Sequence, residues 1–443
     1  MPSFRWSRQT LGLFVLVTVA AVAWPHCRLS GRASAASPVR LAYYVTYDDR
    51  SFASLQGHVA EIDALSPGWY RMDGSGNLSL VADKHFAEIK ALTGASGVKL
   101  LPLVQCAEQG AAFHNTLADA PTRASAVASI RAAVSANGYD GIQIDFEGVD
   151  AADRPHLTAF MAELCGALHA DGKIVCQAVD AKTEERFTGW TGAFDYAALG
   201  QHNDYIVLMA YGYGTSKPQS TSPYAWVSGS AAYAASCIPP SKVLIGIAWY
   251  GYDWDLSTPA ARPVALTAPD AMALASSHGA TITRDEATKS CMFRYSDGGS
   301  THEVWLEDAG SARTKIAVGL DLGFAGWAGW RLGHEDAAFW QDAAPTPSPT
   351  PLPPTATAVP PTPVPDTPTP EPTYAPATAS APDTPTVELS TPTPSPSPTP
   401  SAEPASDPCH AAVPSADDDP FCRYVDSGPF AGLVARGSLG PQL

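Results

Sequence analysis

The sequence predicts an α/β fold, a (β/α)8 TIM barrel with a small α+β insertion between the seventh and eighth strands. Between Val39 and Trp340, short apolar runs alternate with stretches of helical periodicity, which is typical of parallel strands joined by helices. There are eight such runs within about three hundred residues, as a closed (β/α)8 barrel requires. In that architecture an active site lies at the carboxyl ends of the strands.

The eight apolar runs are the predicted strands. They lie at Arg40–Tyr47, within Ala64–Met72, and at Val98–Gln105, Tyr139–Glu147, Lys173–Val179, Tyr205–Tyr211, Val243–Tyr250 and Phe324–Leu332. The clearest helical pattern falls between the fourth and fifth runs, where apolar residues recur at the spacing of one helix face and Gly172 follows as a stop signal. We expect these apolar faces to pack on the barrel, and they imply no cofactor.

The stretch between the seventh and eighth runs is longer than one helix needs. Within it, Ala261–Ala275 has a helical pattern, and Ala280–Trp305 mixes polar and aromatic residues as strands do. We therefore predict a small α+β insertion at about residues 255–316. Placed over the barrel, it would deepen a groove.

Both ends of the chain differ in composition from residues 36–344, which form the predicted barrel domain. Near the amino terminus, Arg5 and Arg8 precede an apolar run and then Ala33-Ser34-Ala35. This order predicts a secretory signal peptide at residues 1–35, and a secreted or cell-surface protein. The alternative is an uncleaved membrane anchor, for which the apolar run is short.

The carboxyl-terminal hundred or so residues are predicted to lack a core of their own. Residues 345–404 are rich in Pro, Thr and Ser and contain no Lys or Arg, which indicates an extended linker. Residues 405–443 are a short segment that is either disordered or stapled by a disulfide between Cys409 and Cys422. This segment is a candidate for association with the cell surface.

Charge and motif content exclude several classes of function. The net charge is -17, whereas nucleic-acid binding needs clustered Lys and Arg, so no nucleic-acid partner is expected. Neither a CxxC pair nor an HExxH sequence occurs, so we predict no metal site and no cofactor.

The fourth predicted strand carries the main candidate site. Because side chains alternate along a strand, Gln143, Asp145 and Glu147 share one face, while the intervening apolar residues share the other. In a closed barrel the acidic face would point inward, where a buried charge is expensive and is kept mostly for function. The alternative is an edge strand with a solvated acidic face.

The fourth run, together with four other stretches, resembles glycoside hydrolase family 18, the chitinase family. Asp140–Glu147 is similar to the DxxDxDxE signature of that family. The other stretches resemble its bacterial branch of spore-cortex-lytic N-acetylglucosaminidases. They are Ser66–Tyr70, Gly246–Trp254, Val304–Ala309 and Trp330–Gly333. The resemblance covers roughly residues 39–340 and implies a barrel glycosidase.

The resemblance also implies catalytic roles. In this family the 2-acetamido oxygen of the substrate attacks the anomeric carbon and gives an oxazolinium intermediate, so one protein acid suffices. By residue-to-residue resemblance, Glu147 is the acid and later the base, and Asp145 orients the acetamido group. Leu208–Gly212 is similar to the family's MxYD motif, in which Tyr211 would hold the acetamido oxygen.

Five further residues are implied as substrate contacts. They are Gln143, Met209, Trp330, Trp69 and Tyr250, the tryptophans and the tyrosine because flat rings suit the apolar face of a sugar. For Tyr211 and Trp330 the alternative is packing within the barrel. The chain departs from the family pattern at Gln143, where typical chitinases have Asp, and at Gly212, where the motif has an acid.

We therefore expect a monomeric, secreted glycosidase whose partner is a polysaccharide containing β-linked N-acetylglucosamine. The amide of Gln143 favours peptidoglycan over chitin, but the sequence leaves both substrates open, as well as exo or endo cleavage. The alternative is a catalytically inactive, chitinase-like carbohydrate-binding protein, which would require loss of the acid. Glu147 and Asp145 are both present.

Overall fold

The computed structural model describes residues 37–107, 113–258 and 262–341. The predicted signal peptide, the linker and the terminal segment with Cys409 and Cys422 lie outside these residues. None of the helices within them is long and apolar enough to span a bilayer. The cysteines found there, from Cys106 to Cys291, form no disulfide with one another.

Every predicted strand is present. The barrel strands are β1 (Val39–Tyr44), β2 (Ala64–Pro67), β3 (Tyr70–Met72), β5 (Lys99–Leu100), β6 (Leu103–Cys106), β7 (Gly141–Asp145), β8 (Ile174–Asp180), β9 (Tyr205–Met209), β10 (Val243–Ala248) and β16 (Gly326–Trp330). The second and third predicted strands are each interrupted, so β2 with β3 and β5 with β6 form one barrel strand apiece. A short strand, β4 (Leu78–Leu80), pairs antiparallel with β3.

The pairing register shows that the barrel is closed. Ala64 of β2 pairs with Lys99 of β5, and Tyr70 of β3 pairs with Val104 of β6, so both ladders join the second barrel strand to the third. From β6 the parallel ladder continues through β7, β8, β9, β10 and β16, and β16 returns to β1. The predicted (β/α)8 barrel is thereby confirmed.

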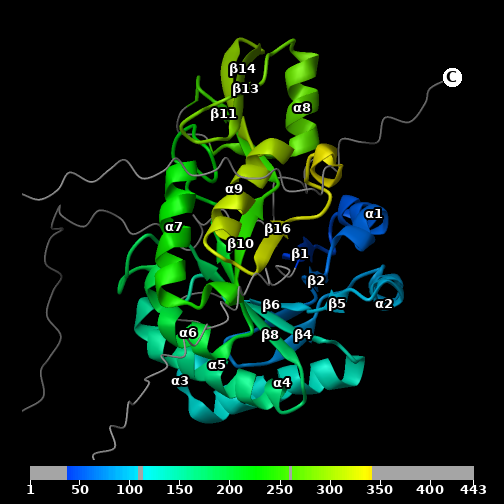
Figure 1. Ribbon diagram of the computed structural model, residues 1–443, viewed down its shortest axis with the longest axis vertical. Helices are drawn as coiled ribbons and strands as arrows, with labels where there is room; N and C mark the ends of the chain where they lie inside the picture. Colours follow the sequence, from blue (N-terminus) through cyan, green and yellow to red (C-terminus); the bar gives the residue numbers. More distant parts are fainter. Residues whose placement is uncertain (1–36, 108–112, 259–261, 342–443) are drawn as a thin grey trace, which may run out of the picture. The chain divides into compact units, whose positions relative to one another are not determined.

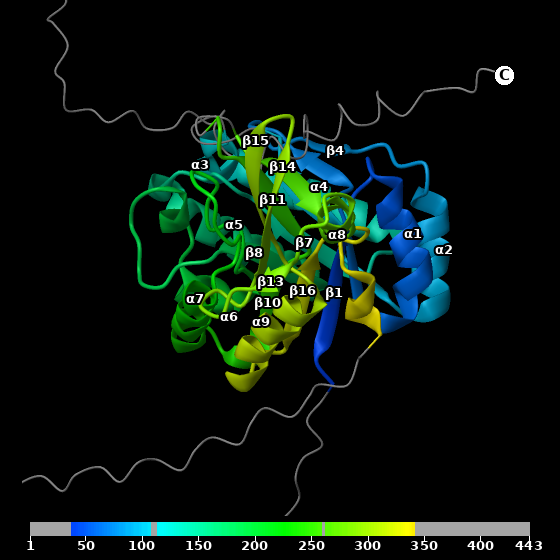
Figure 2. The same ribbon diagram turned by 90° about the horizontal axis from the view of Figure 1, so that it is seen from above.

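Helices lie outside the strands, as the view from above shows (Figure 2). They are α1 (Asp49–His58), α2 (Phe86–Ser96), α3 (His114–Ala118), α4 (Ala120–Asn137), α5 (Arg154–His169), α6 (Tyr196–His202), α7 (Tyr224–Cys237) and α9 (Ala309–Asp321). One apolar cluster fills the layer between strands and helices and includes Ile142, Ile144 and Phe146. A second cluster fills the barrel interior and includes Tyr43, Val207 and Ala328. Alternation along each strand therefore assigns its residues to one layer or the other.

The α+β insertion lies between β10 and β16 in the chain (Figure 1). Its antiparallel sheet has the order β12, β11, β15, β14, β13, and its strands are β11 (Tyr250–Asp255), β12 (Val264–Thr267), β13 (Thr283–Arg284), β14 (Cys291–Asp297) and β15 (Ser300–Leu306). Helix α8 (Ala268–Ser277) covers one face. The insertion thus begins and ends earlier than the predicted range of about 255–316. Residues from Ala309 onward form α9, whose Ala312 and Ile316 belong to the layer around the barrel.

Gly329 on β16 gives a direct test of this packing. A Cβ at this position would lie 2.2 Å from an atom of the buried Trp249 indole, so Gly329→Ala overpacks the layer outside the barrel. We expect it to lower the free energy of unfolding by about 1–3 kcal/mol or more in denaturant titrations. The control is Gly94→Ala in α2, where no atom lies within 4 Å and helix propensity predicts a gain of about 0.5–1 kcal/mol. Equal stability of Gly329→Ala and the parent protein would contradict this packing.

Candidate active site

Three polar residues of the fourth barrel strand point into the barrel, as predicted. Gln143 is fully buried, Asp145 ends β7 with 5% of its surface exposed, and Glu147 follows the strand and is partly exposed. The amide of Gln143 donates a hydrogen bond to the hydroxyl of Tyr43, on β1 across the interior. The strand therefore carries a neutral, hydrogen-bonded amide deep in the barrel and its two carboxylates at the mouth, by which we mean the carboxyl ends of the barrel strands.

Asp145 is held from the neighbouring strand β6. Gln105 Nε2 donates to Asp145 Oδ2 at 3.0 Å, and Arg71 Nη1 donates in turn to Gln105 Oε1. Burial raises the pKa of Asp145 to about 6, although the hydrogen bond from Gln105 and the charge of Arg71 act in the opposite direction. Its other oxygen, Oδ1, is buried and has no hydrogen-bond partner among the described residues. Asp145 therefore titrates near pH 6 and has one oxygen left for a ligand.

Gln105 and Arg71 were missed in the sequence. Gln105 stands at the last inward position of the third barrel strand, so the alternation that singled out Asp145 applies to it as well. Asp180 was missed as well. It ends β8 two residues after the inward Ala178, so alternation places it on the inside too, and it pairs in register with Met209. Arg71 had no such signal, because the break between β2 and β3 shifts the alternation.

Met209, Tyr211 and Tyr250, three of the residues predicted to contact substrate, lie together in the barrel interior. Tyr211 is 5% exposed, and its ring centroid lies 6.4 Å from that of Tyr250 at an interplanar angle of 80°. Burial, and then the negative charge of nearby groups such as Asp145 and Glu147, raises the pKa of Tyr211. Its hydroxyl therefore stays protonated at neutral pH and can donate a hydrogen bond.

Trp330 ends β16 and is partly exposed at the mouth. Its ring packs edge-on against Tyr43, with centroids 5.2 Å apart. Beside it is a recess between the ends of the first, second, third and eighth barrel strands. The recess is lined by Tyr44, Val45, Thr46, Tyr47, Gly68, Arg71, Leu103, Gln105 and Trp330. Trp330 thus lies at the mouth and borders a small recess there.

Trp69 does not lie at the mouth, contrary to the prediction. It is fully buried in the layer outside the barrel, where its ring packs against Phe86 and its Nε1 donates to Asp83 at 2.8 Å. Trp69 lies on the same outward side as Leu65 of β2, four residues earlier. Trp69 is therefore a core residue, and the aromatic signal in the sequence did not distinguish the two layers.

Comparison with known proteins gives the family of the chain. The model of the glycosyl hydrolases family 18 matches residues 40–335, more than half of the sequence. The chain belongs to glycosyl hydrolase family 18. It has the fold of that family, as its fourth strand and the associated motifs predicted. No group of three or more His, Cys, Asp or Glu suited to a metal ion occurs in the part of the family 18 domain that the structure describes.

Relatives of this family 18 chain include enzymes of spore cortex lysis and chitinases. The cortical fragment-lytic enzyme of Bacillus subtilis is 35% identical over 202 residues, which are 44% of this chain and 47% of that protein. The chain thus spans about half the length of the curated relatives it matches. The structure of the spore cortex-lytic enzyme SleL from Bacillus megaterium is 26% identical with a TM-score of 0.64, covering 69% of this chain and 72% of that one. A chitinase from Chromobacterium violaceum has the same TM-score at 27% identity, covering 69% and 97%.

The raised pKa of Asp145 predicts a pH-dependent stability. A carboxyl group whose pKa is about 6 in the folded state and 3.8 as a model group binds its proton more tightly when folded. Its contribution to stability is therefore fully present below the unfolded value and is lost as the pH rises through about 6. Asp145→Asn mimics the protonated form, so near pH 8 it should be more stable than the parent by roughly 2–3 kcal/mol.

The control for this prediction is internal. Near pH 3 the parent Asp145 is protonated in both states, so the two proteins should unfold with nearly the same free energy. Chemical denaturation across the range from about pH 3 to pH 8 measures the gap. Stability curves that run parallel throughout this range would contradict the assigned pKa.

Proposed function

We propose that this protein cleaves a polysaccharide containing β-linked N-acetylglucosamine, with retention of configuration and with the substrate's own acetamido group as nucleophile. The observation that carries the proposal is the placement of Asp145 and Glu147. They are two residues apart, they share the inward side of β7, and only Glu147 reaches the more exposed position at the mouth. This arrangement supplies one proton donor near solvent and one buried carboxyl group below it.

In the proposed reaction Glu147 protonates the leaving glycosidic oxygen while the acetamido oxygen attacks the anomeric carbon. The oxazolinium intermediate forms as the glycosidic bond breaks. Asp145 Oδ1, which has no hydrogen-bond partner in the described part of the barrel, accepts the acetamido N–H and stabilises the positive charge that develops there. Glu147, now a carboxylate, then deprotonates the water that opens the intermediate.

Tyr211 and Trp330 complete the sugar site in this proposal. The protonated hydroxyl of Tyr211 donates to the acetamido oxygen and holds it in line for attack. Trp330, partly exposed at the end of β16, receives the apolar face of the sugar. Gln143 binds Tyr43 and carries no charge, so no second carboxylate of β7 repels Asp145 from below.

We further propose that the protein is secreted and acts on peptidoglycan or chitin. The signal-like amino terminus supports export. The substrate class is supported by the matches to a cortical fragment-lytic enzyme and to a chitinase. Gln143 in place of the usual Asp favours peptidoglycan.

Glu147→Gln tests the proposed acid. Because the amide cannot transfer a proton, we expect kcat on a chromogenic tri-N-acetylchitooligosaccharide to fall by about 10²–10⁴-fold with little change in KM. The control is Glu88→Gln on the outer helix α2, where the carboxylate is exposed, and full activity is expected. Equal activity of Glu147→Gln and the parent protein would refute the assignment.

Product analysis on purified peptidoglycan and on chitin identifies the polymer.

Substrate assistance makes a separate prediction. A thiazoline analogue of N-acetylglucosamine resembles the cyclic intermediate and should inhibit competitively, because the groups proposed to bind the acetamide would bind its ring. Oligosaccharides without the 2-acetamido group lack the nucleophile and should not be cleaved. Steady-state kinetics with both compounds measure this. Efficient hydrolysis of a plain glucan would contradict the mechanism.

A further inference from the structure

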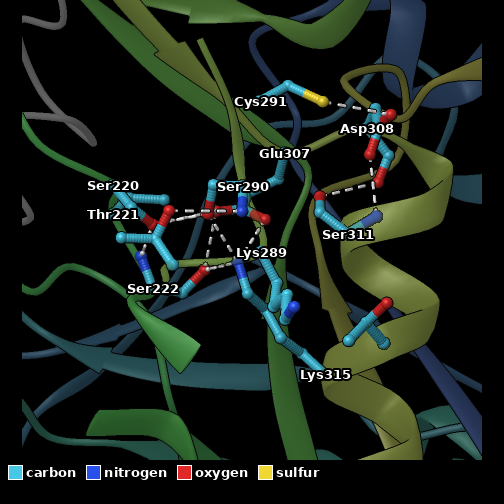
Figure 3. Close-up of polar contacts among 12 residues, drawn as sticks. Ser220, Thr221, Ser222, Lys289, Ser290, Cys291, Glu307, Asp308, Ser311 and Lys315 are labelled. Carbon is cyan, nitrogen blue, oxygen red and sulfur yellow. Dashed lines mark hydrogen bonds and ion pairs between the residues drawn. The ribbon is translucent and has the colours of Figure 1, made fainter. Parts of the chain in front are cut away.

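Figure 3 shows a buried polar cluster that contains none of the proposed catalytic or sugar-binding residues. It consists of Ser220, Ser222, Ser290, Glu307 and Lys315, and we call it the buried clamp. Its members come from the loop after β9, the residue before β14, the residue after β15 and helix α9. The clamp therefore ties the insertion and a barrel helix to the loop that follows Tyr211.

The clamp is built around an ion pair between Lys315 Nζ and Glu307 Oε2. Lys315 also donates to Ser222 Oγ and to Ser290 Oγ, each at 2.9 Å. Both serines donate to Glu307 Oε1, at 2.9 Å from Ser222 and 2.6 Å from Ser290. Ser220 Oγ lies 3.3 Å from the same oxygen and 2.6 Å from Ser290 Oγ. Such a fully bonded pair is tolerated in the interior, but it seldom adds stability over apolar packing.

The clamp is not a nucleophilic site. A serine bonded to a buried lysine can serve as a nucleophile in hydrolases, but it must reach its substrate. Ser222 and Ser290 are 1% and 0% exposed, and Lys315 is 2% exposed. No substrate can reach them, so the cluster must act through its neighbours.

Thr221 connects the clamp to the sugar site. It lies between Ser220 and Ser222, is 3% exposed, and its Oγ1 accepts a hydrogen bond from Gly212 N at 3.1 Å. The same hydroxyl donates to the hydroxyl of Tyr250 at 3.4 Å. A backbone bond from Tyr213 N to Thr221 O, at 2.9 Å, closes the loop on itself.

These contacts bear directly on Tyr211. Gly212 follows it in the chain and has a φ of 75°, a conformation that glycine adopts without strain. Holding Gly212 N therefore fixes the backbone from which Tyr211 projects, and holding the Tyr250 hydroxyl fixes the ring that packs against it. Loops of this kind are otherwise the more mobile part of a barrel enzyme.

We propose that Thr221, held by the buried clamp, is a positioning residue that sets the hydroxyl of Tyr211 for catalysis. The inference rests on the proposed function, in which Tyr211 holds the acetamido oxygen. It assigns the insertion a task in catalysis, since Ser290 belongs to it and Glu307 directly follows its last strand. Small displacements of a positioned group have large effects on rate, so the loss should appear in kcat rather than in KM.

Thr221→Val is the first test. It keeps the shape of the side chain and removes both hydroxyl contacts, so kcat on the chromogenic substrate should fall by about tenfold or more with KM nearly unchanged. Thr221→Ser restores the hydroxyl and should recover most of the activity. The matched control is Thr93→Val in the last turn of α2, another buried threonine, whose hydroxyl bonds only carbonyls of its own helix. It should alter stability alone.

A double-mutant cycle separates positioning from a merely structural role. In a Tyr211→Phe background, Thr221→Val should cost less than about twofold in kcat, because the hydroxyl that it positions is already gone. An equal loss in both backgrounds, or an unchanged kcat for Thr221→Val alone, would overturn the proposal.

Ser222→Ala gives the same answer if Thr221→Val does not fold. It removes one bond to each member of the ion pair and should lower kcat only when Tyr211 is present. An unchanged kcat would again overturn the inference.

Glu147→Gln is assayed in parallel. If that variant is inactive and the Thr221 and Ser222 variants are not, the inference fails and the proposed function stands, whereas full activity of Glu147→Gln refutes the function itself.

Discussion

The burial of one carboxyl group, Asp145, is the constraint on which the mouth of the barrel depends. A charged group at 5% exposure in a barrel interior is expensive unless it is bonded or neutralised. The structure uses both means, since Gln105 bonds one oxygen and burial raises the pKa to about 6. Asp145 therefore titrates near pH 6, and the residues around it determine this pKa.

The neighbours of Asp145 are mostly neutral for the same reason. Gln143 below it is an amide bonded to Tyr43, so β7 adds no second buried charge. Arg71 bonds Gln105, and its positive charge lowers the pKa of Asp145 without overcoming the effect of burial. A carboxylate at position 143 would change this balance, because two close like charges cannot both ionise easily. Gln143, at the position where typical chitinases have Asp, therefore removes a negative charge from the surroundings of Asp145.

Three different signals account for what the sequence predicted. Apolar runs placed the eight strands, alternation assigned Gln143 and Asp145 to the inside of the barrel, and the family resemblance pointed to Met209, Tyr211 and Trp330. Alternation fails at the second barrel strand only after Trp69, where the break between β2 and β3 turns Tyr70 outward and brings Arg71 to the mouth. Trp69 itself lies on the outward side that the alternation of β2 gives, and the prediction for it rested on its aromatic ring alone. A local pattern cannot reveal such a break. The clamp escaped prediction for a different reason, because its members are up to 95 residues apart in the chain, from Ser220 to Lys315, and meet only through the fold.

On each of two sides of the mouth, an ion pair lies behind an aromatic residue of the proposed site. On one side Lys315 and Glu307 back the loop that follows Tyr211. On the other, the fully buried Arg331 follows Trp330 and bonds Asp48 at 3.0 Å, while Tyr47 packs on its guanidinium. Burial and the adjacent Arg331 lower the pKa of His334 beside this pair to about 3, so no further positive charge forms there at neutral pH.

Ion pairs of this kind rarely stabilise a fold over apolar packing, but they fix direction, because each bond has a required geometry that apolar contacts lack. Apolar residues in their place would keep the barrel folded and leave the orientation of the rings less defined. Both pairs lie behind residues of the proposed sugar site, so the directions that they fix are those of Tyr211 and Trp330.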